Sequence, residues 1–233
     1  GKVVQTVGLG PHRLNKPTRP DWFFEREAYG GILCDIASHQ IDQYLYFTGA
    51  TDAEVTMACV GNFATGLPAL ELWPHFFPAL QAVKEHNGYL GLHEYSAPYM
   101  WFGSGPHQLE EGVNEGDEGW LTLRYRKVYR QYLQPAGLDV TLLITETGID
   151  GQVQNRPGPQ GLGWQDFQKF WKEQGQVRTT APGFYIEQLA WYDSKLQEDY
   201  YVRGASIYAL GASNGWGSFE LVGHSADILH QYF

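Results

Sequence analysis

The sequence predicts an α/β protein built around a parallel sheet. Short apolar runs alternate with segments of helical periodicity along the chain, which is typical of this fold class. The run Val140–Ile144 is apolar except for Thr141, as in strands that are buried on both faces of a parallel sheet. Turn residues bound these runs. With 233 residues, the chain is long enough to bury a substantial core.

The first 60 residues are predicted to form a strand–helix–strand segment. Lys2–Leu14 alternates apolar and polar residues, and Gly30–Thr48 carries apolar residues at helical spacing and ends at Gly49. Glu54–Phe63 is rich in β-forming residues and supplies the second strand. Such a βαβ unit is compatible with a right-handed parallel crossover.

The stretch GGILCDIASHQIDQYLYFTGA, residues 30–50, resembles the substrate-domain helix of the Gfo/Idh/MocA oxidoreductases. In that family an Asp-x-x-x-His pair lies beside the nicotinamide, and Asp35 and His39 match it on one helix face. The chain has no strand–GxGxxG–helix unit, and the family's Lys-Pro motif is also missing. We therefore expect Asp35 and His39 to be a relic or a satisfied helix pair, and no nicotinamide to bind.

From Gly61 onward the chain continues as further strands and helices. Strands are expected to end at Asn62–Gly66, His93–Tyr95, Glu146 and Gly211–Trp216, and helices are expected over residues 69–85, 119–133, 164–174, 182–198 and 225–232. Pro74 and Pro78 should kink or split the first of these helices. Asp117 and Glu118 precede the second, where the helix dipole favours acidic side chains.

The segment TETG ends the apolar strand at residues 145–148 and places the carboxylate of Glu146 where a buried strand opens into its loop. That end of the strands is where α/β proteins bind ligands. The motif ITETG resembles the seventh strand of clan A glycoside hydrolases. The order of strand ends in residues 61–233 is similar to strands five to eight of their (β/α)8 barrel. The resemblance implies a partial TIM-barrel-like sheet, with Glu146 as the nucleophile of a retaining reaction.

The same resemblance implies substrate-binding residues around Glu146. His93 and Tyr95 match the sixth strand, and their two-residue spacing puts them on one strand face, within reach of the nucleophile or a sugar hydroxyl. Trp216 matches the residue that floors the sugar site, and Asn62 and Trp101 are further candidates for substrate contact. For His93 and Tyr95 a buried pair satisfied by the backbone is the alternative. For Trp216 the alternative is core packing.

The proton donor is the weak part of the pattern. Retaining glycosidases need a second carboxyl group about 5–5.5 Å from the nucleophile. The chain has no strand that matches the family's fourth strand, which carries this acid. Glu94 and the dipeptide Asn114-Glu115 are substitutes, and Glu94 is the better candidate, although a regular pleat aims it away from His93 and Tyr95.

The sequence therefore predicts a glycoside hydrolase that acts on O-glycosidic bonds. The alternatives are a non-catalytic carbohydrate-binding protein and a residual NAD(P)-dependent oxidoreductase fragment. The His and Cys residues lack metal-ligand spacing, so neither a metal nor another cofactor is expected. Residues 211–215, GASNG, do not match the G-x-S-x-G motif of serine hydrolases.

Composition and charge indicate which partners the protein can bind and where in the cell it is expected. There are 26 acidic and 16 basic residues, for a net charge of −10, which argues against nucleic acid. No leader segment or apolar run of membrane-spanning length is visible, and the two cysteines form no disulfide framework, so a cytoplasmic location is expected. A half barrel would leave two open sheet edges, and would expose apolar residues such as Leu90, Leu92, Leu142 and Ile144. We therefore expect a homodimer, and the alternative is a sheet that flattens into an open doubly wound form with helices on both faces.

Overall fold

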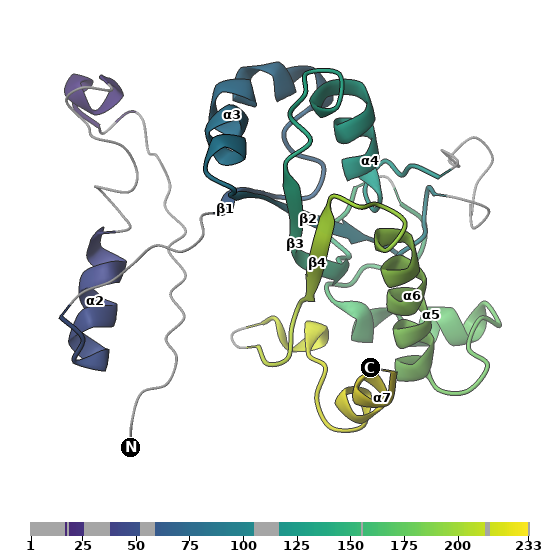
Figure 1. The fold of residues 1–233 in the computed structure, drawn as a ribbon. Coiled ribbons are helices and arrows are strands. Elements are labelled where there is room, and N and C mark those ends of the chain that lie inside the picture. Colours follow the sequence, from purple (N-terminus) through teal and green to yellow (C-terminus); the bar gives the residue numbers. More distant parts are fainter. Residues whose placement is uncertain are drawn as a thin grey trace. The chain divides into compact units, whose positions relative to one another are not determined.

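The computed structural model describes residues 17, 19–25, 38–51, 59–104, 117–154, 156–212 and 215–232. The chain divides into two compact units, residues 1–56 and residues 57–233 (Figure 1). In the first unit, a short 3-10 helix η2 covers Asp21–Phe24, and helix α2 covers Ser38–Thr48. Gly49 follows α2 with a φ of 69°, as expected for a helix that ends at a glycine. The strand expected over Lys2–Leu14 lies outside the described residues.

The second unit is built on four parallel strands. They are β1 (Cys59–Phe63), β2 (Tyr89–Ser96), β3 (Thr141–Ile149) and β4 (Val202–Ile207), and they pair in the order β1-β2-β3-β4. Strands that are neighbours in the chain are therefore neighbours in the sheet, with helical segments between them, as in successive units of a (β/α) barrel. This arrangement confirms the predicted α/β fold with a partial barrel-like sheet.

Strand β1 belongs to the sheet of the second unit. It pairs in parallel with β2, with Val60 opposite Leu90. The expected pairing of residues 54–63 with the N-terminal strand stays a prediction, because that strand lies outside the described residues.

The prolines of the first crossover divide its helix as predicted. A 3-10 helix, η4, covers Leu70–Phe76, and helix α3 covers Phe77–Glu85. Pro78 lies in the first turn of α3, where its missing N–H costs no intrahelical hydrogen bond. Pro74 lies within the 3-10 segment, so the α-helix begins only after it.

The second crossover helix begins later than predicted. Helix α4 covers Arg124–Val128 and continues as a π-helical turn, η5, over Tyr129–Leu133. Leu123 precedes it with a left-handed φ of 66°. Because an α-helix needs a right-handed conformation at every residue, the helix cannot extend back through Leu123. Asp117 and Glu118 therefore do not sit in the first helical turn. Both bind the guanidinium of Arg130 instead.

The remaining helices lie close to their predicted positions. Thr180 caps α6, since its hydroxyl accepts the N–H of Gly183 at 3.1 Å. In the part of the chain that the structure describes, no helix combines the length and the apolar character needed to cross a membrane. The elements are η6 (Trp164–Phe167), α5 (Gln168–Glu173), α6 (Ala181–Leu196), η7 (Gly217–Phe219) and α7 (His224–Tyr232).

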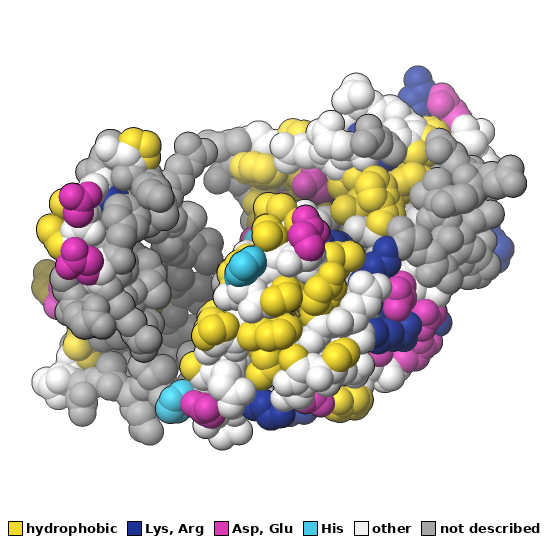
Figure 2. Space-filling model, turned by 90° about the horizontal axis from the view of Figure 1, so that it is seen from above, with side chains coloured by type: hydrophobic (Ala, Val, Ile, Leu, Met, Phe, Trp, Pro, Cys, Tyr) yellow, Lys and Arg dark blue, Asp and Glu magenta, His cyan; other side chains and the backbone are white. Residues whose placement is uncertain are grey.

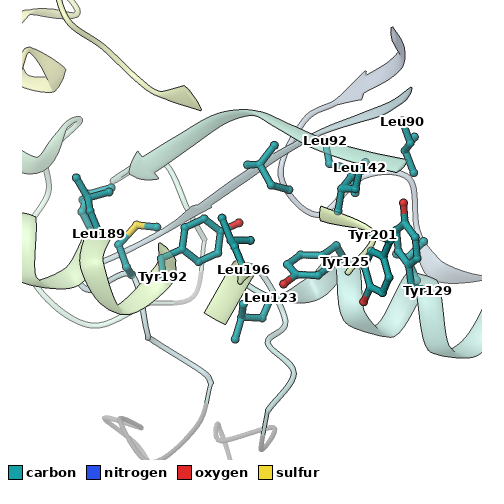
Figure 3. Close-up of a cluster of buried hydrophobic side chains, with 14 of the residues drawn as sticks. Leu90, Leu92, Leu123, Tyr125, Tyr129, Leu142, Leu189, Tyr192, Leu196 and Tyr201 are labelled. Carbon is teal, nitrogen blue, oxygen red and sulfur yellow. The ribbon is translucent and has the colours of Figure 1, made fainter. Parts of the chain in front are cut away.

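The core lies between one face of the sheet and the helices. Leu90, Leu92 and Leu142 pack against rings from α4, η5 and α6 (Figure 3). Tyr129 and Tyr201 stack with a centroid distance of 3.9 Å. We expected these leucines and Ile144 to need a second copy or a flattened sheet to cover them. None of the four is more than 5% exposed, because the helices cover the face on which they lie.

Candidate functional site

A cleft of about 600 Å³ opens at the carboxyl ends of the strands. This is the end of a parallel sheet at which ligands bind in α/β proteins, and it is where the sequence placed the site. The lining residues come from the carboxyl-terminal parts of β2 and β3 and from the loops after β1, β2, β3 and β4. They are Ala64, Thr65, His93, Tyr95, Trp120, Leu121, Glu146, Asp150, Gln152, Val153, Gln154, Tyr208, Trp216 and Phe219.

The structure brings Glu146, His93 and Tyr95 together. The hydroxyl of Tyr95 donates a hydrogen bond to Oε2 of Glu146 at 2.9 Å, and Nδ1 of His93 lies 3.4 Å from the same oxygen. The two partners sit on one face of β2, directly beside β3, because the register sets His93 opposite Glu146. Glu146 is partly exposed, with 39% of its side chain open to solvent. The carboxylate is thus held on one oxygen and accessible from the cleft.

The position of Tyr95 is fixed through its backbone as well. Its N–H donates to the hydroxyl of Thr65 at 3.1 Å, and that hydroxyl lies 3.4 Å from the carbonyl oxygen of His93. Burial, together with the charge of Glu146 and the hydrogen bond to it, raises the pKa of Tyr95 well above its usual range. Tyr95 therefore stays protonated and remains a hydrogen-bond donor to Glu146.

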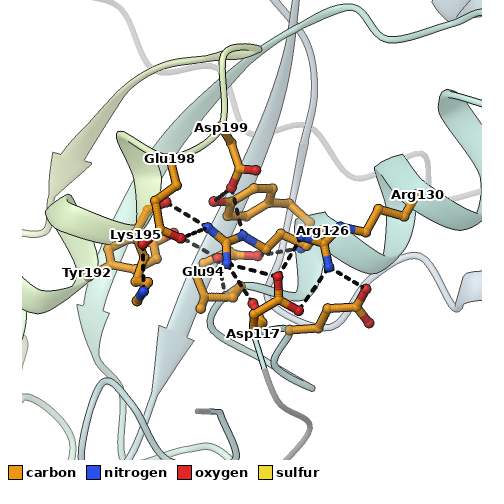
Figure 4. A network of polar contacts seen from close by, with 11 residues as sticks. Glu94, Asp117, Arg126, Arg130, Tyr192, Lys195, Glu198 and Asp199 are labelled. Carbon is orange, nitrogen blue, oxygen red and sulfur yellow. Dashed lines mark hydrogen bonds and ion pairs between the residues drawn. The ribbon is translucent and has the colours of Figure 1, made fainter.

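Glu94 lies on the face of β2 opposite His93 and Tyr95, so the prediction that it donates the proton is wrong. It is 3% exposed and does not line the cleft. Its carboxylate accepts the N–H groups of Leu123 and Tyr125, each at 2.8 Å, and the hydroxyl of Tyr192 at 2.7 Å (Figure 4). Burial raises the pKa of Glu94 to about 7, against the opposing effect of these donors. Glu94 faces away from the cleft because the pleat of β2 turns alternate side chains to opposite faces.

Two predicted substrate contacts also lie away from the cleft. Trp101 packs in an aromatic cluster, with ring centroids 5.8 Å from Tyr99 and 5.9 Å from Phe184. Asn62 is an exposed residue of β1, with a φ of 49°, and is not among the lining residues. Thr65, three residues later, takes its place in the cleft wall. The side chains of Asp35, His39, Asn114 and Glu115 lie outside the described residues.

Trp216 lies in the cleft as predicted and belongs to an aromatic wall. It is 42% exposed, and its ring centroid lies 6.4 Å from Tyr208 and 5.4 Å from Phe219. Trp120 contributes a further ring to the lining. Sequence reasoning missed Tyr208, although it directly follows the last strand at the end where the cleft opens.

Asp150 is the second carboxylate of the cleft, and sequence reasoning missed it too. It follows β3 and falls on the same strand face as Glu146 when residues are counted in steps of two. Oδ1 accepts the N–H of Gln152 at 2.8 Å. Burial raises the pKa of Asp150, although the N–H of Gln152 and the charge of Arg156 act in the opposite direction.

The described residues hold no group of three or more His, Cys, Asp or Glu side chains that could ligate a metal ion. In the cleft, only His93, Glu146 and Asp150 could serve as such ligands.

The comparisons with known proteins bear on the first third of the chain. A family model described as the GFO/IDH/MocA C-terminal domain matches residues 1–75. The match supports the resemblance noted for residues 1–60, and extends it into β1 and the crossover that follows. It ends before His93, so most of the cleft lies beyond it. No curated protein matches the chain. No solved structure matches it either. The resemblance to glycoside hydrolases therefore rests on the residues alone.

Proposed function

We propose that this protein hydrolyses O-glycosidic bonds and that Glu146 is the catalytic carboxylate. The observation that carries this proposal is the convergence of Tyr95 and His93 on one oxygen of a partly exposed glutamate at the end of a parallel sheet. The hydrogen bond from Tyr95 and the approach of His93 Nδ1 both act on Oε2, so Oε1 is the oxygen we assign to the attack. The aromatic wall around Trp216 supplies a surface on which the apolar face of a sugar ring can stack.

In the first step Oε1 of Glu146 forms a bond to the anomeric carbon while the bond from that carbon to the leaving oxygen breaks. The hydrogen bond from Tyr95 holds the carboxylate in the orientation for attack. Water then hydrolyses the glycosyl ester and returns Glu146 to its carboxylate form. The step needs the leaving oxygen either to accept a proton or to be stable as an anion.

Among the described cleft residues, Asp150 is the only other carboxyl group that could donate this proton. Four residues of extended chain put the Cα atoms of Glu146 and Asp150 about 13 Å apart. Even side chains that lean toward each other then leave the carboxyl groups farther apart than the roughly 5–5.5 Å of a retaining pair. We therefore do not assign Asp150 as the acid. Glycosides of nitrophenols test Glu146 separately, since nitrophenolate leaves without protonation.

The experiment compares Glu146→Gln with the unchanged protein on a panel of nitrophenyl glycosides. Loss of the attacking carboxylate should reduce kcat by at least about a thousandfold. Glu173→Gln, an exposed glutamate on α5 that pairs with Lys169, is the matched control and should keep full activity. Equal rates for Glu146→Gln and the unchanged protein would remove Glu146 from the mechanism.

A carbohydrate-binding protein without turnover is the second candidate. The absence of an acid near Glu146 among the described residues favours it, because the aromatic wall can bind a sugar without any acid. Oligosaccharide titration with saturable binding and no hydrolysis of nitrophenyl glycosides would support this candidate. The oxidoreductase alternative draws on the family match to residues 1–75, and a fluorescence titration with NADH tests it.

A further inference from the structure

The cleft carries negative charge that its described residues do not neutralise. Glu146 and Asp150 contribute two carboxylates, and no Lys or Arg is among the described lining residues. His93 is the only basic side chain there, and it lies against Glu146. Even if His93 is protonated, one negative charge remains, at Asp150. The cleft therefore disfavours anionic ligands and favours those with positive charge.

The positive charge of Arg156 lowers the pKa of Asp150, but its guanidinium makes its hydrogen bonds to other groups. Its guanidinium donates to the carbonyl oxygens of Gly151, at 2.7 and 3.1 Å, and of Pro157 and Pro159, at 3.0 and 2.9 Å. The group also lies 4.9 Å from the ring centroid of Phe167. These contacts hold it within its own loop and outside the cleft lining, so it weakens the charge of Asp150 without pairing with it.

The hydrogen-bond donors that the structure shows on Asp150 are neutral groups of Gln152. Oδ1 accepts the N–H of Gln152 at 2.8 Å, and the side chain of Gln152 supplies a further hydrogen bond. A partly buried carboxylate whose donors are neutral gains from a cationic hydrogen-bond donor. Burial raises the pKa of Asp150, and a cation placed directly against the carboxylate would favour its charged form.

The aromatic wall suits the same kind of ligand. The rings of Tyr208, Trp216 and Phe219 lie 5.4–6.4 Å apart. Phe219 is 2% exposed and supports the other two, whereas Trp216 is 42% exposed and can contact the C–H surface of a sugar or an ammonium group. A ligand that combines a pyranose ring with a positive charge would use the rings and the carboxylate together.

We infer that the cleft binds amino sugars with a free ammonium group, and that Asp150 is the residue that recognises the ammonium. This inference rests on the proposed function in that it names the class of sugar for the same site. Asp150 acts here on specificity and takes no part in bond cleavage, so binding alone reports on its role.

The test compares three oligosaccharides that differ at one substituent: glucosamine oligomers, N-acetylglucosamine oligomers and cello-oligomers of equal length. Binding is measured by calorimetry at mildly acidic pH on the Glu146→Gln protein, which prevents hydrolysis during the titration. The glucosamine oligomer should bind at least about tenfold more tightly than the other two, a difference of about one charge-assisted hydrogen bond.

Asp150→Asn on this background should abolish most of the preference. Asp227→Asn is the matched control, because Asp227 is exposed on α7 and its loss changes the net charge by the same amount. A preference that persists in Asp150→Asn, or that falls equally in Asp227→Asn, would overturn the inference. So would equal binding of the three oligomers, or binding of none. These results are independent of turnover: a protein that binds glucosamine oligomers selectively but cleaves no nitrophenyl glycoside would lose the proposed function and keep this specificity.

Discussion

At the scale of single residues, a substitution of Tyr95 tests most directly what its hydrogen bond to Glu146 contributes to catalysis. Tyr95→Phe deletes the donor at 2.9 Å from Oε2 and keeps the ring. A hydrogen bond to a charged group is worth about 1.5–3 kcal/mol, so kcat/KM on nitrophenyl glycosides should fall by about 10- to 100-fold. Tyr200→Phe removes a similar bond, to Asp139 at 2.7 Å, from an exposed site and should leave the rate unchanged. Equal effects of the two variants would contradict the role of Tyr95.

The buried carboxyl group of Glu94 makes the free energy of unfolding depend on pH. Its pKa is raised from 4.5 to about 7 by burial, so the folded protein holds this proton over a range in which the unfolded chain has lost it. The resulting stabilisation is complete below pH 4.5 and is lost as the pH rises toward 7. It amounts to about 3 kcal/mol, since one pKa unit is worth about 1.4 kcal/mol.

Urea unfolding at a series of pH values tests this linkage. The difference in unfolding free energy between the unchanged protein and Glu94→Gln should shrink as the pH rises through this window, because the glutamine does not titrate. Glu173→Gln should follow the unchanged protein at every pH. A Glu94→Gln protein that keeps the full pH slope would show that other groups cause it.

At the scale of secondary-structure elements, Arg126 links α4 to the C-terminal end of α6 through hydrogen bonds and ion pairs. Its side chain is 1% exposed. The guanidinium donates to Asp199 at 2.7 Å, to Glu198 at 2.9 Å and to the carbonyl oxygen of Lys195 in the last turn of α6 at 2.8 Å (Figure 4). Cations are favourable at helix C-termini, where carbonyl groups lack partners. Because α4 follows Trp120 and Leu121 in the chain, this contact also steadies one wall of the cleft.

Arg126→Met should lower the unfolding free energy by about 3–5 kcal/mol, because it removes a buried cation that donates to Asp199, to Glu198 and to the carbonyl oxygen of Lys195. Arg130→Met is the control. Arg130 pairs with Asp117 and Glu118 but is 40% exposed, so its loss should cost less than about 1 kcal/mol. Chemical denaturation measures both. Similar losses in the two variants would mean that burial of Arg126 adds nothing to its contacts.

The same elements show what sequence reasoning could reach. Glu146, His93, Tyr95 and Trp216 were found because strand ends and the two-residue period are local properties. The start of α4 was misplaced because a side chain 29 residues away binds the N–H of Leu123. Long-range contacts of this kind leave no mark in local periodicity.

Some misses were avoidable and others were not. Counting in twos from Glu146 would have led to Asp150, and the strand before residue 208 pointed to Tyr208. The direction of Glu94 also follows from the two-residue period, which turns it away from His93 and Tyr95. The position of Trp101 depends on the rings of Tyr99 and Phe184 that pack against it. The sequence alone does not specify such partners.

At the scale of the whole molecule, the open edges of the sheet remain the basis for a homodimer. The burial of Leu90, Leu92 and Leu142 removes the argument from an uncovered face. Within the described residues of the second unit, however, β1 and β4 each pair on one side only. An unpaired edge presents free N–H and carbonyl groups, which another chain can bind. The space-filling view also shows hydrophobic side chains gathered on one face of this unit (Figure 2).

We propose that two copies pair through β1, and light scattering tests this. A dimer has a mass of twice 26.3 kDa. Val60→Lys places a charge on β1, where Val60 is 39% exposed, and should shift the protein to monomer. Val222→Lys alters a side chain that is 50% exposed outside the sheet, and should leave the dimer intact. A mass of one chain that persists on concentration to the micromolar range would refute the dimer, and β1 would then be an edge that tolerates solvent because it is only five residues long.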